Sequence, residues 1–156
     1  MVSRRRFLIG GGAVLGTTAV AGCGGLLSSG GEFQFEEVTF TDGKPAGVGT
    51  YDRQPETTYE RGEDVWVYLE MGYPPTDDNG TAKLAFTFRV ETPNGETWNP
   101  VEKEETWEDA EDSILLFAQG FGTDVDDDPG EYEMSITVDD RVEEQQITTT
   151  ETFTLE

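Results

Sequence analysis

Apolar residues at every second position are the feature that most restricts how this chain folds. Three segments carry the pattern plainly, Val65 to Met71, Leu84 to Val90 and Tyr132 to Val138. A period of two places successive side chains on opposite faces of a β-strand, so one face of each segment is buried. Turn-forming residues separate the segments, at Asp77 to Gly80 and at Pro93 to Gly95. The pattern predicts an all-β protein.

Three further segments are less regular. The run Phe33 to Phe40 changes parity at Glu36 and Glu37, which indicates a β-bulge or a switch between sheets. A last, polar strand carries Ile147, Phe153 and Leu155 on one parity. Residues 99–113 are rich in glutamate and are compatible with a long loop, a short helix or an edge strand. We favour an irregular crossover that leads into a strand over Ile114 to Ala118. About seven antiparallel strands without a helical period predict a two-sheet sandwich.

The segments Arg61 to Val65 and Asp128 to Tyr132 resemble those of immunoglobulin-like and fibronectin-like sandwich domains. In such domains a Pro-Gly turn followed by tyrosine introduces the penultimate strand, and the tyrosine hydroxyl bonds to backbone upstream. The resemblance covers most of residues 32–156. It implies an immunoglobulin-like antiparallel β-sandwich of about seven strands, and it implies no particular function because this architecture has many roles.

Three tryptophans are candidates to fill the centre of this sandwich, because the chain has one cysteine and therefore no disulfide between the sheets. The candidates are Trp66, Trp98 and Trp107, and the sequence does not choose among them. Trp66 and Tyr68 have the parity opposite to the core residues of their strand. We expect them to be covered by packing, and ligand contact is the alternative.

The first 23 residues look like an export signal with a lipid-attachment site. A basic cluster from Arg4 to Arg6 precedes an apolar segment, Phe7 to Ala21, whose 15 residues are too few to cross a bilayer core of about 30 Å. The pair Arg4 and Arg5, followed by Phe7 and Leu8, resembles a twin-arginine signal. The small residues before Cys23 resemble a lipobox, which implies lipidation of Cys23.

These features predict the layout of the chain and its location. We expect a signal peptide over residues 1–22, a lipidated cysteine with a Gly/Ser tether over 23–31, and a folded domain over 32–156. The tether has a root-mean-square reach of about 15 Å. The protein is then exported by the twin-arginine pathway and held at the outer face of the cell membrane by the lipid on Cys23.

The charge of the chain excludes some partners. Cleavage before Cys23 leaves 7 basic and 33 acidic residues, a formal net charge of −26. Such a surface repels nucleic acid, so we expect no nucleic-acid partner. In molar salt the Debye length falls to about 3 Å, which screens the self-repulsion. With the lipobox, the composition resembles exported lipoproteins of halophilic archaea.

Two candidate sites remain in the folded part. Asp124, Asp126 and Asp128 alternate like the start of a calcium loop, although Pro129 and Ser135 exclude an EF-hand because they replace its glycine and its bidentate glutamate. A looser Ca²⁺ site at one end of the sandwich is a candidate. The alternative is a solvated loop. Asn79 begins the sequon Asn-Gly-Thr and is a candidate for N-glycosylation, or for a plain turn.

The residue inventory points away from an enzyme. With no histidine, Ser-His-Asp and Cys-His catalysis, the usual catalytic zinc sites and blue-copper ligation are excluded. We expect a non-enzymatic binding or structural module without a cofactor, whose partner is a cell-envelope protein or a small solute. The alternative is a calcium-stabilised or solute-binding lipoprotein, and a carboxylate-based hydrolase is a remote third.

Overall fold

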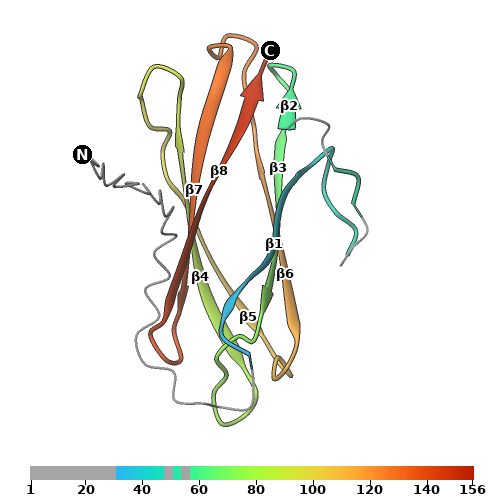
Figure 1. The fold of residues 1–156 in the computed structure, drawn as a ribbon, viewed down its shortest axis with the longest axis vertical. Coiled ribbons are helices and arrows are strands. Elements are labelled where there is room, and N and C mark those ends of the chain that lie inside the picture. The colour runs from blue at the N-terminus through green and yellow to red at the C-terminus, as the bar shows by residue number, and fades with distance from the viewer. Residues whose placement is uncertain (1–30, 48–50, 54–56) are drawn as a thin grey trace, which may run out of the picture.

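Eight β-strands form the part of the chain that the computed structural model describes, residues 31–47, 51–53 and 57–156 (Figure 1). They are β1 (Gln34–Thr41), β2 (Thr58–Tyr59), β3 (Val65–Gly72), β4 (Ala82–Glu91), β5 (Val101–Trp107), β6 (Ile114–Phe121), β7 (Gly130–Asp140) and β8 (Gln146–Leu155). The expected signal peptide, Cys23 and residues 24–30 of the tether lie outside the described residues. Within those described, no helix has the length and apolar character needed to cross a membrane.

The strands form two facing sheets (Figure 1). Sheet A has the order β1-β3-β6, and sheet B has the order β2-β8-β7-β4-β5. Neighbouring strands are antiparallel, except that the short β2 runs parallel to the end of β8. The prediction of an all-β, immunoglobulin-like antiparallel β-sandwich is confirmed. The described strands number eight instead of about seven, because β2 is too short and β5 too polar to show the expected alternation.

Aromatic contacts between the sheets show which strands lie opposite each other. Phe86 of β4 stacks on Phe117 of β6, with ring centroids 4.0 Å apart. Phe40 of β1 meets Phe153 of β8 at 5.5 Å. Sheet A therefore lies with β6 over β4 and with β1 over β8, and the alternating apolar residues fill the space between the sheets. The strand β5 extends beyond the edge of sheet A.

None of the three candidate tryptophans fills the centre of the core. Phe86, Phe88 and Phe117 stack there instead. Trp98 and Trp107 are partly buried and pack at the margin of the core. Trp66 lies on the outer face of sheet A, where its indole covers Gly120; a Cβ atom at Gly120 would be 2.8 Å from the ring. Phenylalanine stacking thus takes the place of a central tryptophan.

The parity change predicted in the first strand is a β-bulge. Phe35 pairs with Met71 and Glu37 pairs with Glu70, so Glu36 has no partner residue in the β1-β3 ladder. The extra residue lets Phe35, Val38 and Phe40 all pack on the core side. The sequence Asp139-Asp140 also suggests a turn, but β7 continues to Asp140 and the chain reverses over residues 141–145.

The irregular crossover that we favoured for residues 99–113 is wrong. Residues 101–107 form β5, which pairs with β4 from Phe88 opposite Val101 to Ala82 opposite Trp107. The crossover itself is limited to residues 108–113. The glutamates that obscured the strand are tolerated because no strand of sheet A covers β5, so its inner face is open to solvent at its middle.

The tyrosine corner predicted from the sequence is present. The Tyr132 side chain is 1% exposed, and its hydroxyl donates to the Asp128 carbonyl oxygen at 2.7 Å. Gly130 has a φ of 137°, a backbone conformation that residues with a Cβ atom rarely adopt. The Pro-Gly-Glu-Tyr segment therefore sets how the chain enters β7, as in immunoglobulin-like domains.

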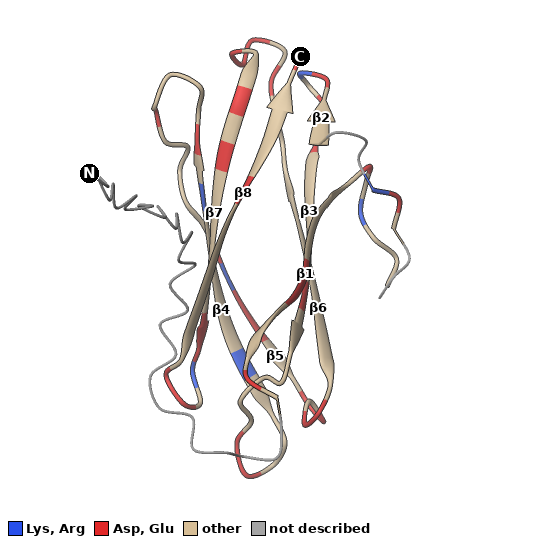
Figure 2. Cartoon of the chain, viewed as in Figure 1, with Lys and Arg blue, Asp and Glu red and all other residues tan. Residues whose placement is uncertain are grey.

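Acidic side chains are spread over the strands and loops (Figure 2). Only two ion pairs join described side chains: Arg53 with Glu37, and Arg141 with Glu104 at 3.9 Å. Most carboxylates in the described part of the chain are therefore neutralised by no neighbouring cation. Repulsion between carboxylates without a neighbouring cation is weakened by screening salt.

Candidate functional site

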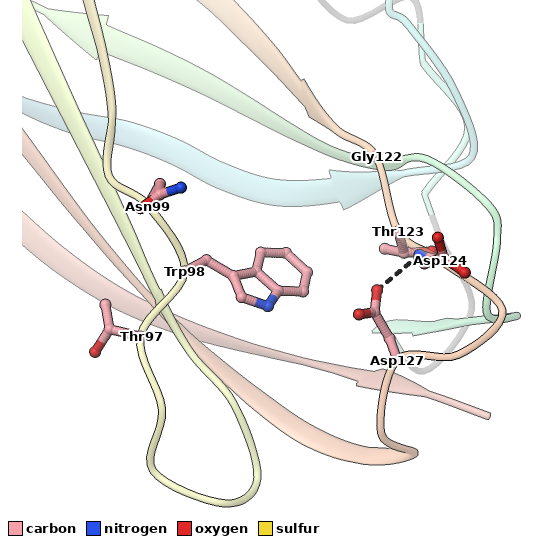
Figure 3. Close-up of a pocket in the computed structure, with 7 residues that line it drawn as sticks. All are labelled: Thr97, Trp98, Asn99, Gly122, Thr123, Asp124 and Asp127. Carbon is pink, nitrogen blue, oxygen red and sulfur yellow. Dashed lines mark hydrogen bonds between the residues drawn. The ribbon is translucent and has the colours of Figure 1, made fainter.

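The end of the sandwich that carries the β4-β5 and β6-β7 connections holds the candidate site (Figure 3). Trp98 follows a turn over residues 92–95, and its backbone N–H donates to the Val90 carbonyl at 2.9 Å. This bond brings the indole to the open end between the two sheets. The ring packs against Tyr132, with centroids 5.3 Å apart, and against Phe153 at 6.5 Å. Part of the indole remains exposed.

A loop of four aspartates, residues 124–128, faces the tryptophan. The Asp124 backbone N–H donates to the Asp127 carboxylate at 2.7 Å, and the Asp126 N–H donates to the Asp124 carboxylate at 3.1 Å. Asn94 of the opposite connection donates to the Asp128 carboxylate. These bonds hold the loop in a compact turn whose remaining carboxylate oxygens face solvent.

Two open depressions adjoin the exposed part of Trp98. The first has a volume of about 550 Å³ and lies between the tryptophan and the loop (Figure 3). The second, of about 520 Å³, lies between the β4-β5 turn and Tyr132. No lysine or arginine lines either depression. Together they are lined by Thr92, Glu96, Thr97, Trp98, Asn99, Gly122, Thr123, Asp124, Asp126, Asp127, Asp128 and Tyr132.

The electrostatic character of this end is acidic. Burial raises the pKa of Tyr132 above its ordinary value, and the nearby carboxylates of Asp127 and Asp128 raise it further. Arg61 acts in the opposite direction from the far side of the loop, where its guanidinium donates to the Asp127 carbonyl at 3.4 Å. The site therefore combines an aromatic surface with carboxylates, a combination that attracts cations and hydroxyl donors.

The structure brings Asp124, Asp126 and Asp128 into the same loop, as their spacing predicted. Two of these carboxylates accept hydrogen bonds, from Asp126 N–H and from the Asn94 side chain. In the described part of the chain, no group of three or more potential ligands is arranged to hold a metal ion. Calcium binding by this loop stays a prediction.

Asn79 is exposed in the β3-β4 connection, at the opposite end of the sandwich. Its backbone N–H donates to the Asp77 carboxylate at 2.9 Å, and Gly80 follows with a φ of 78°. Asn79 is therefore an exposed residue of a tight turn. The structure is compatible with both the sequon and the plain turn, and glycosylation stays a prediction.

Tyr68 is covered, as we expected, whereas Trp66 is half-buried and packs against Gly120. Tyr68 is fully buried although it points outward from sheet A, because Tyr51 lies over it with ring centroids 4.3 Å apart. Arg53 lies above the Tyr51 ring and pairs with Glu37. This small cluster closes part of the outer face of sheet A.

The sequence did not single out the Trp98 site. Trp98 was a candidate only for the core, because its position beside the aspartate loop depends on two connections 25 to 30 residues apart in the chain. The available signal was a tryptophan three residues after a Pro-Asn-Gly turn, a place where an aromatic side chain can lie at the end of a sheet.

Comparison with protein-family models gives no match, and neither does comparison with curated proteins. Among solved structures, the C-terminal domain of wzt is similar over 80% of this chain and 73% of its own, at 8% identity and a TM-score of 0.51. A family 123 glycoside hydrolase from Clostridium perfringens matches 64% of this chain at 12% identity and a TM-score of 0.47. The chain spans only 23% of that hydrolase. The seventh ScaB type I cohesin from Pseudobacteroides cellulosolvens gives 13% identity, 64% coverage of this chain and 86% of its own, and a TM-score of 0.33. At 8% identity, the likeness to the C-terminal domain of wzt shows a shared fold and nothing about function.

Proposed function

We propose that this protein is an exported, lipid-anchored module at the outer face of the cell membrane, which binds a small organic cation at Trp98 without catalysing a reaction. The observation that carries the proposal is the exposed part of the Trp98 ring between carboxylates, with no basic residue lining the depressions beside it. The twin-arginine pair and the lipobox before Cys23 support export and anchoring.

The position of Gly31, the last residue of the expected tether, supports this assignment. Gly31, where the described chain begins, lies against the ring of Tyr73 at the end of β3. Trp98 lies at the other end, beyond the last residues of β4. Since β4 has ten residues, at about 3.3 Å each, the two ends are separated by roughly 33 Å. A lipid on Cys23 thus leaves the Trp98 end facing away from the membrane and accessible to solutes.

The chemistry of the site favours a cation over other solutes. A quaternary or primary ammonium group over an indole face gains about 0.5–2 kcal/mol from the ring quadrupole, and nearby carboxylates add Coulomb attraction. Anionic solutes are repelled by the net charge of −23. A neutral sugar would gain stacking and hydrogen bonds but nothing from the net charge.

Several features support binding instead of catalysis. The depressions are open, and the Asp124 and Asp127 carboxylates accept hydrogen bonds from backbone of their own loop. A general acid needs a carboxyl sheltered from water. Asp124, Asp126 and Asp128 are exposed and Asp127 is half-buried, so none of the four is sheltered.

The experiment that tests the proposal uses the full-length protein in detergent and molar KCl. Isothermal titration compares choline with its neutral isostere 3,3-dimethylbutanol, which has the same shape but no charge. We expect choline to bind and the isostere to bind at least about tenfold more weakly, a difference of roughly 1.4 kcal/mol. Trp98→Leu should abolish the preference, while Trp66→Phe on sheet A should preserve it. Equal binding of the two probes, or none of either, would contradict the assignment.

A further inference from the structure

The free edge of β6 is the one strand edge in the described sheets without a protective device. Exposed edges invite pairing with other chains and are normally blocked by charges, bulges or short length. β1 has its bulge and Glu37, β2 has two residues, and β5 carries Glu102, Lys103 and Glu104. β6 (Ile114–Phe121) has no charged residue along its eight residues, although 28% of the whole chain is charged (Figure 2).

The outer face of β6 is apolar as well as uncharged. Ile114, Leu116, Ala118 and Gly120 point away from the core, since they pair with the outward-facing residues of β3. Ile114 is 54% exposed, and the Trp66 indole extends the apolar surface beside Gly120. An edge and a face that both lack charge form a continuous apolar surface.

The strand β5 of sheet B lies beneath the space next to the free edge of β6. Lys103 is directly opposite Phe86, and Glu105 is directly opposite Leu84, so all four side chains point toward sheet A. Phe86 and Leu84 are fully buried, whereas Lys103 and Glu105 are exposed. The difference arises because β6 covers β4 and nothing in the described part of the chain covers β5. Sheet A therefore has room for one more strand, next to β6 and over β5.

The charges at the two ends of this slot define its occupant. Before β6 the connection carries Glu108, Asp109, Glu111 and Asp112, all exposed, and after β6 comes the aspartate loop of residues 124–128. A segment that fills the slot lies beside the uncharged β6, has Lys103 and Glu105 of β5 beneath its middle, and meets carboxylates at both ends. We propose that β6 receives an extended segment of a partner protein, uncharged in its centre and basic at its ends, as an added strand of sheet A.

A second copy of this chain does not fit the slot. Antiparallel pairing of two β6 strands would place the acidic connection of one copy beside the aspartate loop of the other. In addition, β4 lies beneath β6 in each copy, so a second copy would bring its β4 into the space of β5. A single strand avoids both conflicts.

The test uses the full-length protein in detergent, at the lowest KCl concentration that preserves its near-ultraviolet circular dichroism. The probe is a synthetic peptide of four valine-threonine repeats with lysine at both ends. We expect saturating peptide to slow amide hydrogen exchange at least about tenfold in Ile114–Phe121. The same peptide with glutamate ends should bind at least about tenfold more weakly. An N-methylated version, which lacks alternate N–H donors, should not protect β6.

Matched variants separate the edge from the rest of the sheet. Leu116→Lys places a charge on β6 opposite Glu70, where an opposite charge is tolerated by the fold. Thr39→Lys makes the same change on β1, the other edge of sheet A. The first variant should lose peptide protection and the second should keep it. The proposal is overturned if protection maps outside β6, if glutamate ends bind equally well, if no protection occurs, or if sedimentation shows that β6 pairs two copies instead.

Discussion

Tyr132 offers the sharpest test of how this sandwich is held together. Its hydroxyl donates to the Asp128 carbonyl at 2.7 Å, and its ring stacks on Phe153 with centroids 5.2 Å apart and planes inclined by 16°. Tyr132→Phe removes only the hydrogen bond, so it should lower the free energy of unfolding by about 0.5–1.5 kcal/mol. Tyr132→Ala also removes a fully buried ring and leaves a cavity, so it should cost about 3–5 kcal/mol.

The neighbouring residue is the matched control for this series. Glu133 points to the outer face of sheet B and lies directly opposite Glu91 of β4. Like charges that face each other across two strands repel, so Glu133→Ala should be neutral or slightly stabilising. Urea melts of the three variants at one fixed KCl concentration measure the order. If Glu133→Ala proves as damaging as Tyr132→Ala, the packing of β7 and the corner argument are both refuted.

Three other perturbations test the remaining expectations. The full chain should lose stability in low salt and regain it with KCl or CaCl₂ at equal ionic strength; recovery in micromolar CaCl₂ alone would instead indicate a specific site in residues 124–128. Arg4→Lys with Arg5→Lys should block export, whereas Cys23→Ser should leave export intact and release the protein from the membrane pellet in cell fractionation. Backbone N–H donors hold the pKa of Asp77 below its ordinary value, so its stabilising effect is present above the ordinary carboxyl pKa and is lost as pH falls through the folded value. Thermal melts of Asp77→Ala and wild type should therefore converge on acidification, and a gap that stays constant would contradict this.

The strands that were predictable from the sequence are those covered on one face and solvated on the other. β4 and β7 show this plainly, because every second residue is buried between the sheets. β5 does not show this alternation. No strand of sheet A covers it, and both of its faces carry exposed charged residues. β2 has only two residues, which no alternation can reveal. β5 was therefore missed because sheet A leaves it uncovered, and β2 was missed because it is too short.

The candidate site was less predictable than the fold. Tyr132 and its hydrogen bond followed from a local motif of five residues. The depression beside Trp98 forms only because the β4-β5 turn and the aspartate loop lie close together. No local sequence pattern indicates this long-range contact. Likewise, Tyr68 is buried on an outward-facing position only because Tyr51, 17 residues earlier, lies over it. The periodicity of a strand shows which face of the sheet a residue lies on. It does not show whether another segment covers that face.

Salt adaptation, which we expect for this chain, would place acidic residues wherever side chains reach solvent. β5 follows that rule on both faces, and so do the connections at each end of the sandwich. Several exposed apolar residues do not follow it, among them Tyr73 and Val125, and two such places adjoin the proposed sites. At Trp98 an aromatic ring stays partly exposed among carboxylates, and at β6 an isoleucine is 54% exposed on an edge without charge. Exposed apolar groups cost solvation free energy, and adaptation to salt does not explain why they are present on an acidic surface. A binding role at these two places supplies the reason, because the partner would cover the apolar groups when it binds.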